Sequence, residues 1–206
     1  MKRKVLVLDI ETAPNLVAVY SLRQRYINPK YIKAAGYVLC FSAQFIGEKD
    51  VHYAKSPDGH REMLEKIHAL LLRAEAVVHY NGKKFDMPTL NKEFVVHGLA
   101  PIPPRVQIDL FVLVKRAFNF PSYKMDYVCK ALGIRGKERH MGWSMWEACM
   151  DHLNEKHAKA WVVMERYNKG DIRATRALYK KLLPWFEQTF GFKRISEWLD
   201  GRRTRP

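Results

Sequence analysis

The sequence has few cysteines, no long apolar run and comparatively few acids, and each shortage excludes a class of protein. Its three cysteines are odd in number and lack CxxC spacing, so a disulfide framework is not expected and the thiols should be reduced. No apolar stretch nears the roughly 20 residues that span a bilayer. The basic start meets acids after a short apolar run, which does not fit a signal peptide. We therefore expect a cytoplasmic protein.

The shortage of acids leaves a strongly basic chain. Lysine and arginine number 36 against 21 acids, giving a net charge of +15. This favours a polyanionic partner, either nucleic acid or an anionic membrane surface, although a merely soluble basic protein can also carry such a charge. The length of 206 residues and the apolar content of 48% predict a single domain over residues 1–206, with a basic flexible tail at about 200–206.

Hydrophobic periodicity predicts an α/β fold. Strands are expected at Lys4–Ile10, Tyr37–Ile46, Val51–Ala54, Ala76–Tyr80 and Arg105–Ile108. Helices are expected at His60–Ala74, Asp86 to about His97, from Asp109 onward, Tyr123–Leu132, Ser144–Leu153 and Glu155–Leu183, with Asp86 and Asp109 as N-caps. A hairpin followed by strand–helix–strand units indicates a mixed β-sheet flanked by α-helices. The basic, aromatic stretch Asn15–Ala35 fits no element, and we interpret it as a surface excursion.

Two acids stand at the end of the first strand. Side chains alternate along a strand, so Asp9 and Glu11 should point to the same face. Adjacent carboxylates repel unless a positive charge compensates, and a divalent cation such as Mg2+ or Mn2+ does this with hard oxygen ligands. The alternative is two surface acids at a fraying strand end.

A second acid, Asp86, lies in the segment HYNGKKFDMPTL, which leads from a strand into a helix. Such strand ends form the usual ligand crevice of parallel-type sheets, although Asp86 could also be a plain helix cap. Lys83 and Lys84 are suited to phosphate contacts.

A tyrosine and an acid, Tyr167 and Asp171, share one face of the last long helix. Leu178 lies on the same face, which makes it the inner side, where an acid needs a partner or a metal. A lone YxxxD pair is common by chance, so this spacing gains weight only together with the other acids.

Taken in order, the three motifs resemble those of the DEDD (DnaQ-like) 3'-5' exonuclease superfamily. DxE matches Asp9 to Glu11 and is followed by the typical Thr12, NxxxFD matches Asn81 to Asp86, and YxxxD matches Tyr167 to Asp171. The chain has Arg166 where the histidine subfamily has histidine, so the resemblance is to the tyrosine (DEDDy) subfamily. Other stretches are similar to stand-alone predicted exonucleases of phages and bacteria.

This resemblance implies a ribonuclease H-like fold and a metal-dependent 3'-5' exonuclease that releases nucleoside 5'-monophosphates. Two divalent cations, Mg2+ or Mn2+, would clamp the attacking and leaving oxygens. The ligands and the residue that orients water would be Asp9, Glu11, Asp86, Asp171 and Tyr167. The expected substrate-binding residues are Thr12, Asn81, Phe85, Lys83 and Lys84, although Phe85 could equally belong to the core.

Three further expectations concern substrate, partners and location. We favour single-stranded DNA over RNA, while the same chemistry on RNA and a catalytically silent nucleic-acid-binding module stay as alternatives. Replication or recombination proteins acting in trans are expected partners, and a membrane is not. The location would be the cytoplasm of a bacterial cell or a phage-infected host.

One cysteine lies near two histidines. Cys149, His152 and His157 are close in sequence, but no second ligand pair accompanies them. We interpret them as ordinary helix residues rather than a zinc site.

Overall fold

The computed structural model describes residues 3–136, 138, 140–190, 197–198 and 201. The strands are β1 (Val5–Thr12), β2 (Leu16–Val17), β3 (Ile32–Ala34), β4 (Val38–Phe45), β5 (His52–Lys55), β6 (Ala76–His79) and β7 (Val106–Asp109). The α-helices are α1 (His60–Arg73), α2 (Asp86–Val96), α3 (Leu110–Ala117), α4 (Met125–Ala131), α5 (Trp143–Met150) and α6 (His157–Phe190). Short 3-10 helices occupy Pro29–Tyr31 and Ser56–Asp58. None of the described helices is long and apolar enough to cross a membrane.

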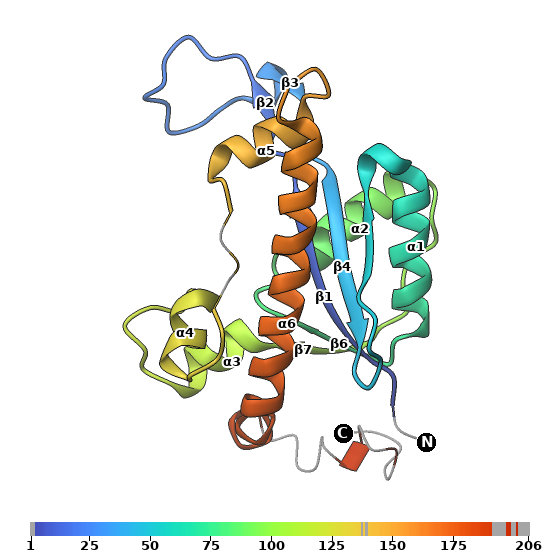
Figure 1. Cartoon of the computed structure of the whole chain (residues 1–206), viewed down its shortest axis with the longest axis vertical. Helices are drawn as coiled ribbons and strands as arrows, with labels where there is room; N and C mark the ends of the chain where they lie inside the picture. The colour runs from blue at the N-terminus through green and yellow to red at the C-terminus, as the bar shows by residue number, and fades with distance from the viewer. Residues whose placement is uncertain (1–2, 137, 139, 191–196, 199–200, 202–206) are drawn as a thin grey trace.

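Five strands form one mixed sheet in the order β5-β4-β1-β6-β7 (Figure 1). β4 runs antiparallel to both β5 and β1, whereas β1, β6 and β7 run parallel. The predicted mixed sheet flanked by helices is therefore confirmed. Because β1, β6 and β7 point the same way, their carboxyl ends meet at one edge of the sheet, where side chains of different strands come together.

Helices α1 and α2 cover one face of the sheet. Every second residue of β1 points to this face, and Leu6, Leu8 and Ile10 are all at most 4% exposed. They pack in one cluster with apolar residues of the two helices, namely Met63, Leu64, Ile67, Leu70, Leu71, Leu90 and Phe94. The helical spacing of the α1 residues explains why the sequence predicts this helix correctly.

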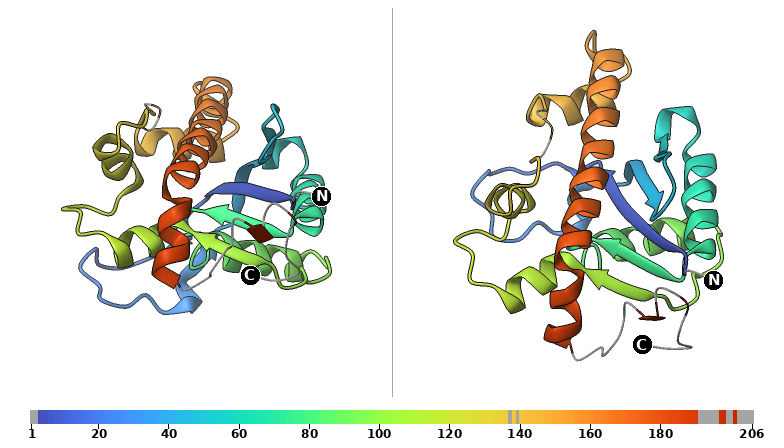
Figure 2. Two further views of the ribbon diagram at one scale, coloured as in Figure 1. Left: turned by 90° about the horizontal axis from the view of Figure 1, so that it is seen from below. Right: turned by 60° about the horizontal axis from the view of Figure 1, so that its bottom comes forward.

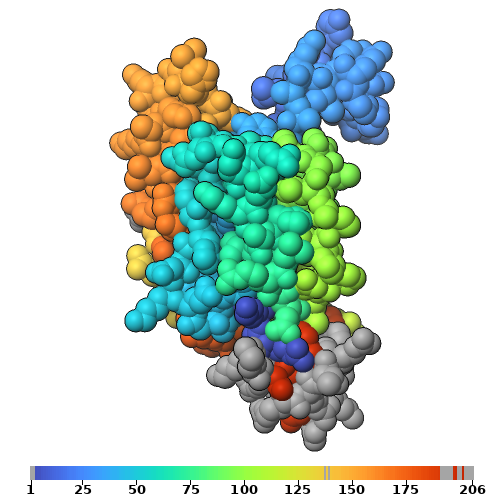
Figure 3. All heavy atoms as spheres, turned by 90° about the vertical axis from the view of Figure 1, so that its right-hand side faces the viewer, coloured from blue at the N-terminus to red at the C-terminus, as the bar shows by residue number. Residues whose placement is uncertain are grey.

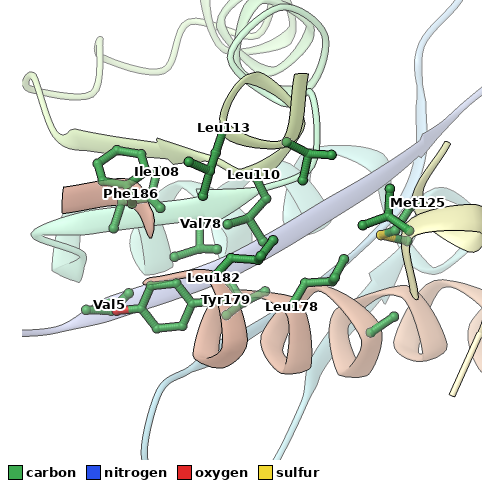
Figure 4. Packing of buried hydrophobic residues seen from close by; sticks show 14 of the residues in the cluster. Val5, Val78, Ile108, Leu110, Leu113, Met125, Leu178, Tyr179, Leu182 and Phe186 are labelled. Carbon is green, nitrogen blue, oxygen red and sulfur yellow. The ribbon is translucent and has the colours of Figure 1, made fainter. Parts of the chain in front are cut away.

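The long helix α6 crosses the other face, together with α3 and α4 (Figure 2). Figure 4 shows Val5 and Val78 of the sheet packed against Leu178 and Leu182 of α6. The alternation that turns Val5 and Val7 toward α6 also turns Asp9 and Glu11 to that side. The fold thus aims the two acids of β1 at a helix from the far end of the chain.

Residues between β1 and β4 form a lobe that stands away from the body of the protein (Figure 3). β2 and β3 pair there as a separate two-stranded sheet. Tyr20 and Leu22 are each 97% exposed, so the lobe contributes little to the core. This confirms the interpretation of Asn15–Ala35 as a surface excursion. The basic tail lies outside the described residues except for Gly201.

Two local predictions need correction. Asp86 is not the N-cap of α2: Phe85 takes that position, and Asp86 Oδ1 instead accepts a hydrogen bond of 3.2 Å from the backbone N–H of Ile10. The last helix continues through Pro184 to Phe190, beyond its predicted end at Leu183. Asp109 does cap α3, since its carboxylate accepts from the backbone N–H groups of the first turn.

Candidate functional site

Three carboxylates converge where β1 meets α6. Oxygen atoms of Asp9, Glu11 and Asp171 all lie within 4.8 Å of one another. The β1–β4 register shifts between Glu11 and Thr12, and such irregularities re-aim side chains at functional edges of sheets. Asp171 is 1% exposed, while the two β1 acids are half-buried. Like charges held this close favour a bound cation.

Asn168 of α6 fixes the first acid in place. Its side-chain amide donates a hydrogen bond of 2.6 Å to Asp9 Oδ2. Asn168 is 0% exposed, so water does not compete for this contact. Sequence reasoning missed Asn168, although its position directly after Tyr167 on the inner side of the helix was a usable indication.

Asp86 reaches β1 from the helix-α2 side. It is 5% exposed, and burial raises the pKa of its carboxyl to about 6, partly opposed by nearby His79 and by the Ile10 N–H. Asp86 is not part of the cluster formed by Asp9 and its two neighbouring acids. Its hydrogen bond to the backbone N–H of Ile10 instead places it beside the residue that follows Asp9, at the border of the cluster.

A buried network holds the turn between β6 and α2. Asp109 accepts hydrogen bonds from the backbone N–H groups of Asn81 (2.9 Å) and Lys83 (3.1 Å), and its Oδ2 lies 3.4 Å from His79 Nδ1. Burial would raise the pKa of Asp109, but His79 and these N–H donors outweigh it and lower the pKa. At Gly82 a Cβ atom would lie 2.6 Å from His79 Cγ, so only glycine fits this turn.

Tyr167 lies on α6 one turn before Asp171. It is 6% exposed and its ring makes edge contacts with His140, at 5.0 Å between centroids, and with Trp146, at 6.1 Å. These aromatic neighbours hold the phenol ring in a fixed orientation beside the acids. Neither neighbour was singled out from the sequence.

The remaining predicted residues lie at the end of β1 and in the turn between β6 and α2. Thr12 ends β1 and is half-buried, and Asn81 has a left-handed backbone with φ of 68°. Lys83 and Lys84 are exposed, as is Phe85, whose side chain is 47% accessible. The core interpretation of Phe85 is therefore wrong, since its ring faces solvent at the start of α2.

Two adjoining hollows lead away from Asp9. One of about 440 Å³ is lined by Asp9, Tyr80 and Lys124 among others, and in the next, of about 580 Å³, four of the eight lining residues are basic. Both share Asn81 and Phe111. The cations of the second hollow are Lys83, Lys84, Lys115 and Arg116. Together the hollows make a groove with Asp9 at one end and these four cations at the other.

Comparison with protein families shows which family this chain belongs to. The family model of the RNase_H superfamily matches residues 33–183, most of the chain. The chain belongs to the RNase H superfamily. The predicted ribonuclease H-like fold is thus confirmed. The matched segment contains Asp86, Tyr167 and Asp171, whereas Asp9 and Glu11 precede it and join Asp171 only through the fold.

Several relatives of this RNase H-like chain are archaeal polymerases. It is 23% identical over 158 residues to DNA polymerase 1 of Pyrococcus abyssi, a match that covers 66% of this chain and 20% of that protein. DNA polymerase of Thermococcus litoralis is 24% identical over 160 residues, covering 66% of this chain and 9% of that protein. The chain therefore spans a fifth or less of the length of these relatives.

A solved structure shares the fold. The family B DNA polymerase from the hyperthermophilic archaeon Pyrobaculum calidifontis superposes with a TM-score of 0.64 at 20% identity. The superposition covers 88% of this chain and 25% of the polymerase chain. The RNase H-like arrangement of sheet and helices described above is thus also found within a much longer polymerase chain.

Proposed function

We propose that this protein is a metal-dependent 3'-5' exonuclease that hydrolyses phosphodiester bonds of DNA. The observation that carries the proposal is the convergence of Asp9, Glu11 and Asp171 at the carboxyl end of β1, next to a basic groove. The spacing of Tyr167 and Asp171 supports assignment to the tyrosine subfamily. As a single domain over 1–206, the chain would carry this activity by itself.

The acids fit a divalent cation. Their donors are all carboxylate oxygens, the ligand type that Mg2+ and Mn2+ prefer, and their mutual repulsion at this distance is relieved by a cation. Asp9, Glu11 and Asp171 would hold one ion, and Asp9 with Asp86 would hold a second. When bound, the ions would activate water and neutralise charge on the leaving oxygen.

The protein's own residues position the reaction. Asn168 holds Asp9 through its 2.6 Å hydrogen bond, so the carboxylate keeps its orientation as substrate arrives. Tyr167, held by its aromatic neighbours, would orient the attacking water through a hydrogen bond to its hydroxyl group.

The groove suits a single strand that enters with its 3' end at the acids. Exposed Lys83 and Lys84, with Lys115 and Arg116, would neutralise backbone phosphates. The exposed ring of Phe85 offers a stacking face for a base. Thr12 and Asn81, at the acidic end, would contact the terminal nucleotide.

The relatives favour DNA as the substrate. The named matches are DNA polymerases, and the net charge of +15 fits a nucleic-acid partner. Replication or recombination proteins acting in trans are the partners we propose for the same reason.

A gel assay tests the proposal. Two 5'-labelled single strands, one of DNA and one of RNA, are incubated with the protein in Mn2+, in Mg2+ and in EDTA. We expect a metal-dependent ladder that shortens from the 3' end, faster on DNA. A faster RNA ladder would move the substrate to RNA, and binding without any ladder would contradict the exonuclease.

A further inference from the structure

We propose a second metal site, selective for zinc, formed by His60, Glu93 and His97. One ligand atom of each residue lies within 4.8 Å of the others. His60 Nε2 is 3.0 Å and His97 Nε2 is 3.7 Å from the same oxygen, Glu93 Oε2. The three residues come from the first turn of α1 and the C-terminal turn of α2.

The distances and the ligand types suit zinc. Neighbouring ligands of a tetrahedral zinc ion lie about 3.3 Å apart when each bond is about 2.0–2.1 Å, and the two distances to Glu93 Oε2 bracket this value. Two imidazoles and one carboxylate are a common zinc set, whereas Mg2+ disfavours nitrogen ligands. Glu93 and His97 are four residues apart on one helix, a spacing that aims both at the same point.

The surroundings of the Glu93 carboxylate favour cation binding at one of its two oxygens. The Glu93 side chain is 4% exposed, and its other oxygen, Oε1, is 2.8 Å from Lys92 Nζ. Lys92 therefore neutralises one oxygen and leaves Oε2 facing the two histidines. Without zinc the same oxygen accepts a hydrogen bond from His60, and metal binding would replace that proton.

The site opens into a hollow of about 630 Å³. Its lining includes the site's three residues and also Cys149, His152 and His157. Among the described residues these three make no ligand cluster with one another or with the site. Burial raises the pKa of Cys149 to about 12, which does not favour a thiolate ligand. Zinc would thus keep a fourth position for water or a small anionic ligand entering the hollow.

This site is independent of the proposed nuclease centre. Its residues belong to α1 and α2, and none of them is in the acidic cluster of β1 and α6. By joining the start of α1 to the end of α2, zinc would stabilise the folded protein in proportion to its occupancy.

The test is zinc binding to the full chain in an Asp9→Ala background, which removes a ligand of the acidic cluster. Isothermal titration with Zn2+ in excess Mg2+ should show one equivalent per chain, and the melting temperature should rise with zinc. His97→Ala and His60→Ala should each weaken binding at least tenfold and abolish the thermal shift. His152→Ala, in the same hollow but outside the cluster, is the matched control and should bind as the background does.

Two results would overturn the site. One is the absence of a Zn2+ isotherm from the folded Asp9→Ala protein; the other is an isotherm that both histidine variants leave unchanged. Circular dichroism establishes that each variant is folded. Because two histidine variants are made, the test still works if one of them fails to fold. Because the readout is binding rather than hydrolysis, failure of the exonuclease proposal would not affect it.

Discussion

Among the described residues, two clusters of side chains could hold a metal ion, and they differ in their ligand atoms. The acidic cluster of Asp9, Glu11 and Asp171 offers oxygen alone, whereas the cluster of His60, Glu93 and His97 offers two nitrogens and one oxygen. Oxygen ligands suit Mg2+ and Mn2+, and imidazole suits zinc. Under the two proposals, this one fold would bind different cations at the two clusters because the ligand types differ.

Helix α2 connects the two clusters. Asp86 at its first residue borders the acidic cluster, while Glu93 and His97 near its end belong to the histidine cluster. Seven residues of helix separate Asp86 from Glu93, about 10 Å along the axis. Substitutions at one end of α2 should therefore change metal binding at one cluster and leave it unchanged at the other. The following experiments test that separation.

The largest effect is expected from Asp9→Ala. This change removes a carboxylate that both proposed ions would share, so hydrolysis should fall by about 10³-fold or more. Rates on 5'-labelled DNA in Mn2+ measure it, with His97→Ala as the matched control that keeps its activity. Hydrolysis near the wild-type rate in folded Asp9→Ala would contradict the assignment of the acidic cluster.

A smaller loss is expected from Asn168→Ala. The change removes the hydrogen bond to Asp9, and loss of such a supporting contact typically costs about 10–100-fold in metal affinity or activity. The variant should need more Mn2+ for half-maximal rate, while DNA binding in Ca2+ stays the same. Asn91→Ala, at an exposed asparagine of α2, is the control. An unchanged Mn2+ dependence would show that Asn168 does not position Asp9.

Asp86→Asn should change stability with pH. Burial raises the pKa of Asp86 in the folded protein to about 6. Its contribution to the stability of the folded protein is therefore fully present below about pH 3.8 and is lost as the pH rises through about 6. Asparagine keeps the neutral form at all pH values. In EDTA the variant should be more stable than wild type by about 3 kcal/mol at pH 8, with little difference at pH 4.

Urea unfolding at both pH values measures this difference. Adding Mn2+ at pH 8 should stabilise wild type more than Asp86→Asn if the carboxylate is a ligand. A variant that is less stable than wild type in EDTA at pH 8 would contradict the account of buried charge.

The smallest effect is expected in the groove. Lys84→Ala removes one proposed phosphate contact, so DNA binding should weaken a few-fold and the slope of log affinity against log salt should fall by about one. Lys66→Ala, an exposed lysine of α1 outside the groove, is the control. Equal slopes for the two variants would mean that Lys84 does not contact phosphate.

Local patterns predicted much of the fold and the acids of β1. Alternation along β1 is a property of adjacent residues, so it correctly indicated that Asp9 and Glu11 share a side. The capping role of Asp86 was mispredicted because Ile10, 76 residues earlier, competes for its carboxylate. The end of α6 was placed before Pro184, but burial of Leu182 and Phe186 in the core outweighs the helix-breaking tendency of proline.

Long-range contacts explain what sequence reasoning missed. Asn168 meets Asp9 across 159 positions, and no motif joins them until α6 lies across β1. His60 meets Glu93 across 33 positions, and only the spacing of Glu93 and His97 hinted at a shared face. Both contacts depend on how elements pack, which a local pattern does not contain.

The most direct test of the central claim is Mn2+ binding measured by isothermal titration in wild type, Asp9→Ala and His97→Ala. The account predicts that Asp9→Ala loses Mn2+ binding and that His97→Ala keeps it at the wild-type affinity. Retention of Mn2+ by Asp9→Ala, with loss in His97→Ala, would contradict the assignment of the acidic cluster as the site of the hydrolytic metal.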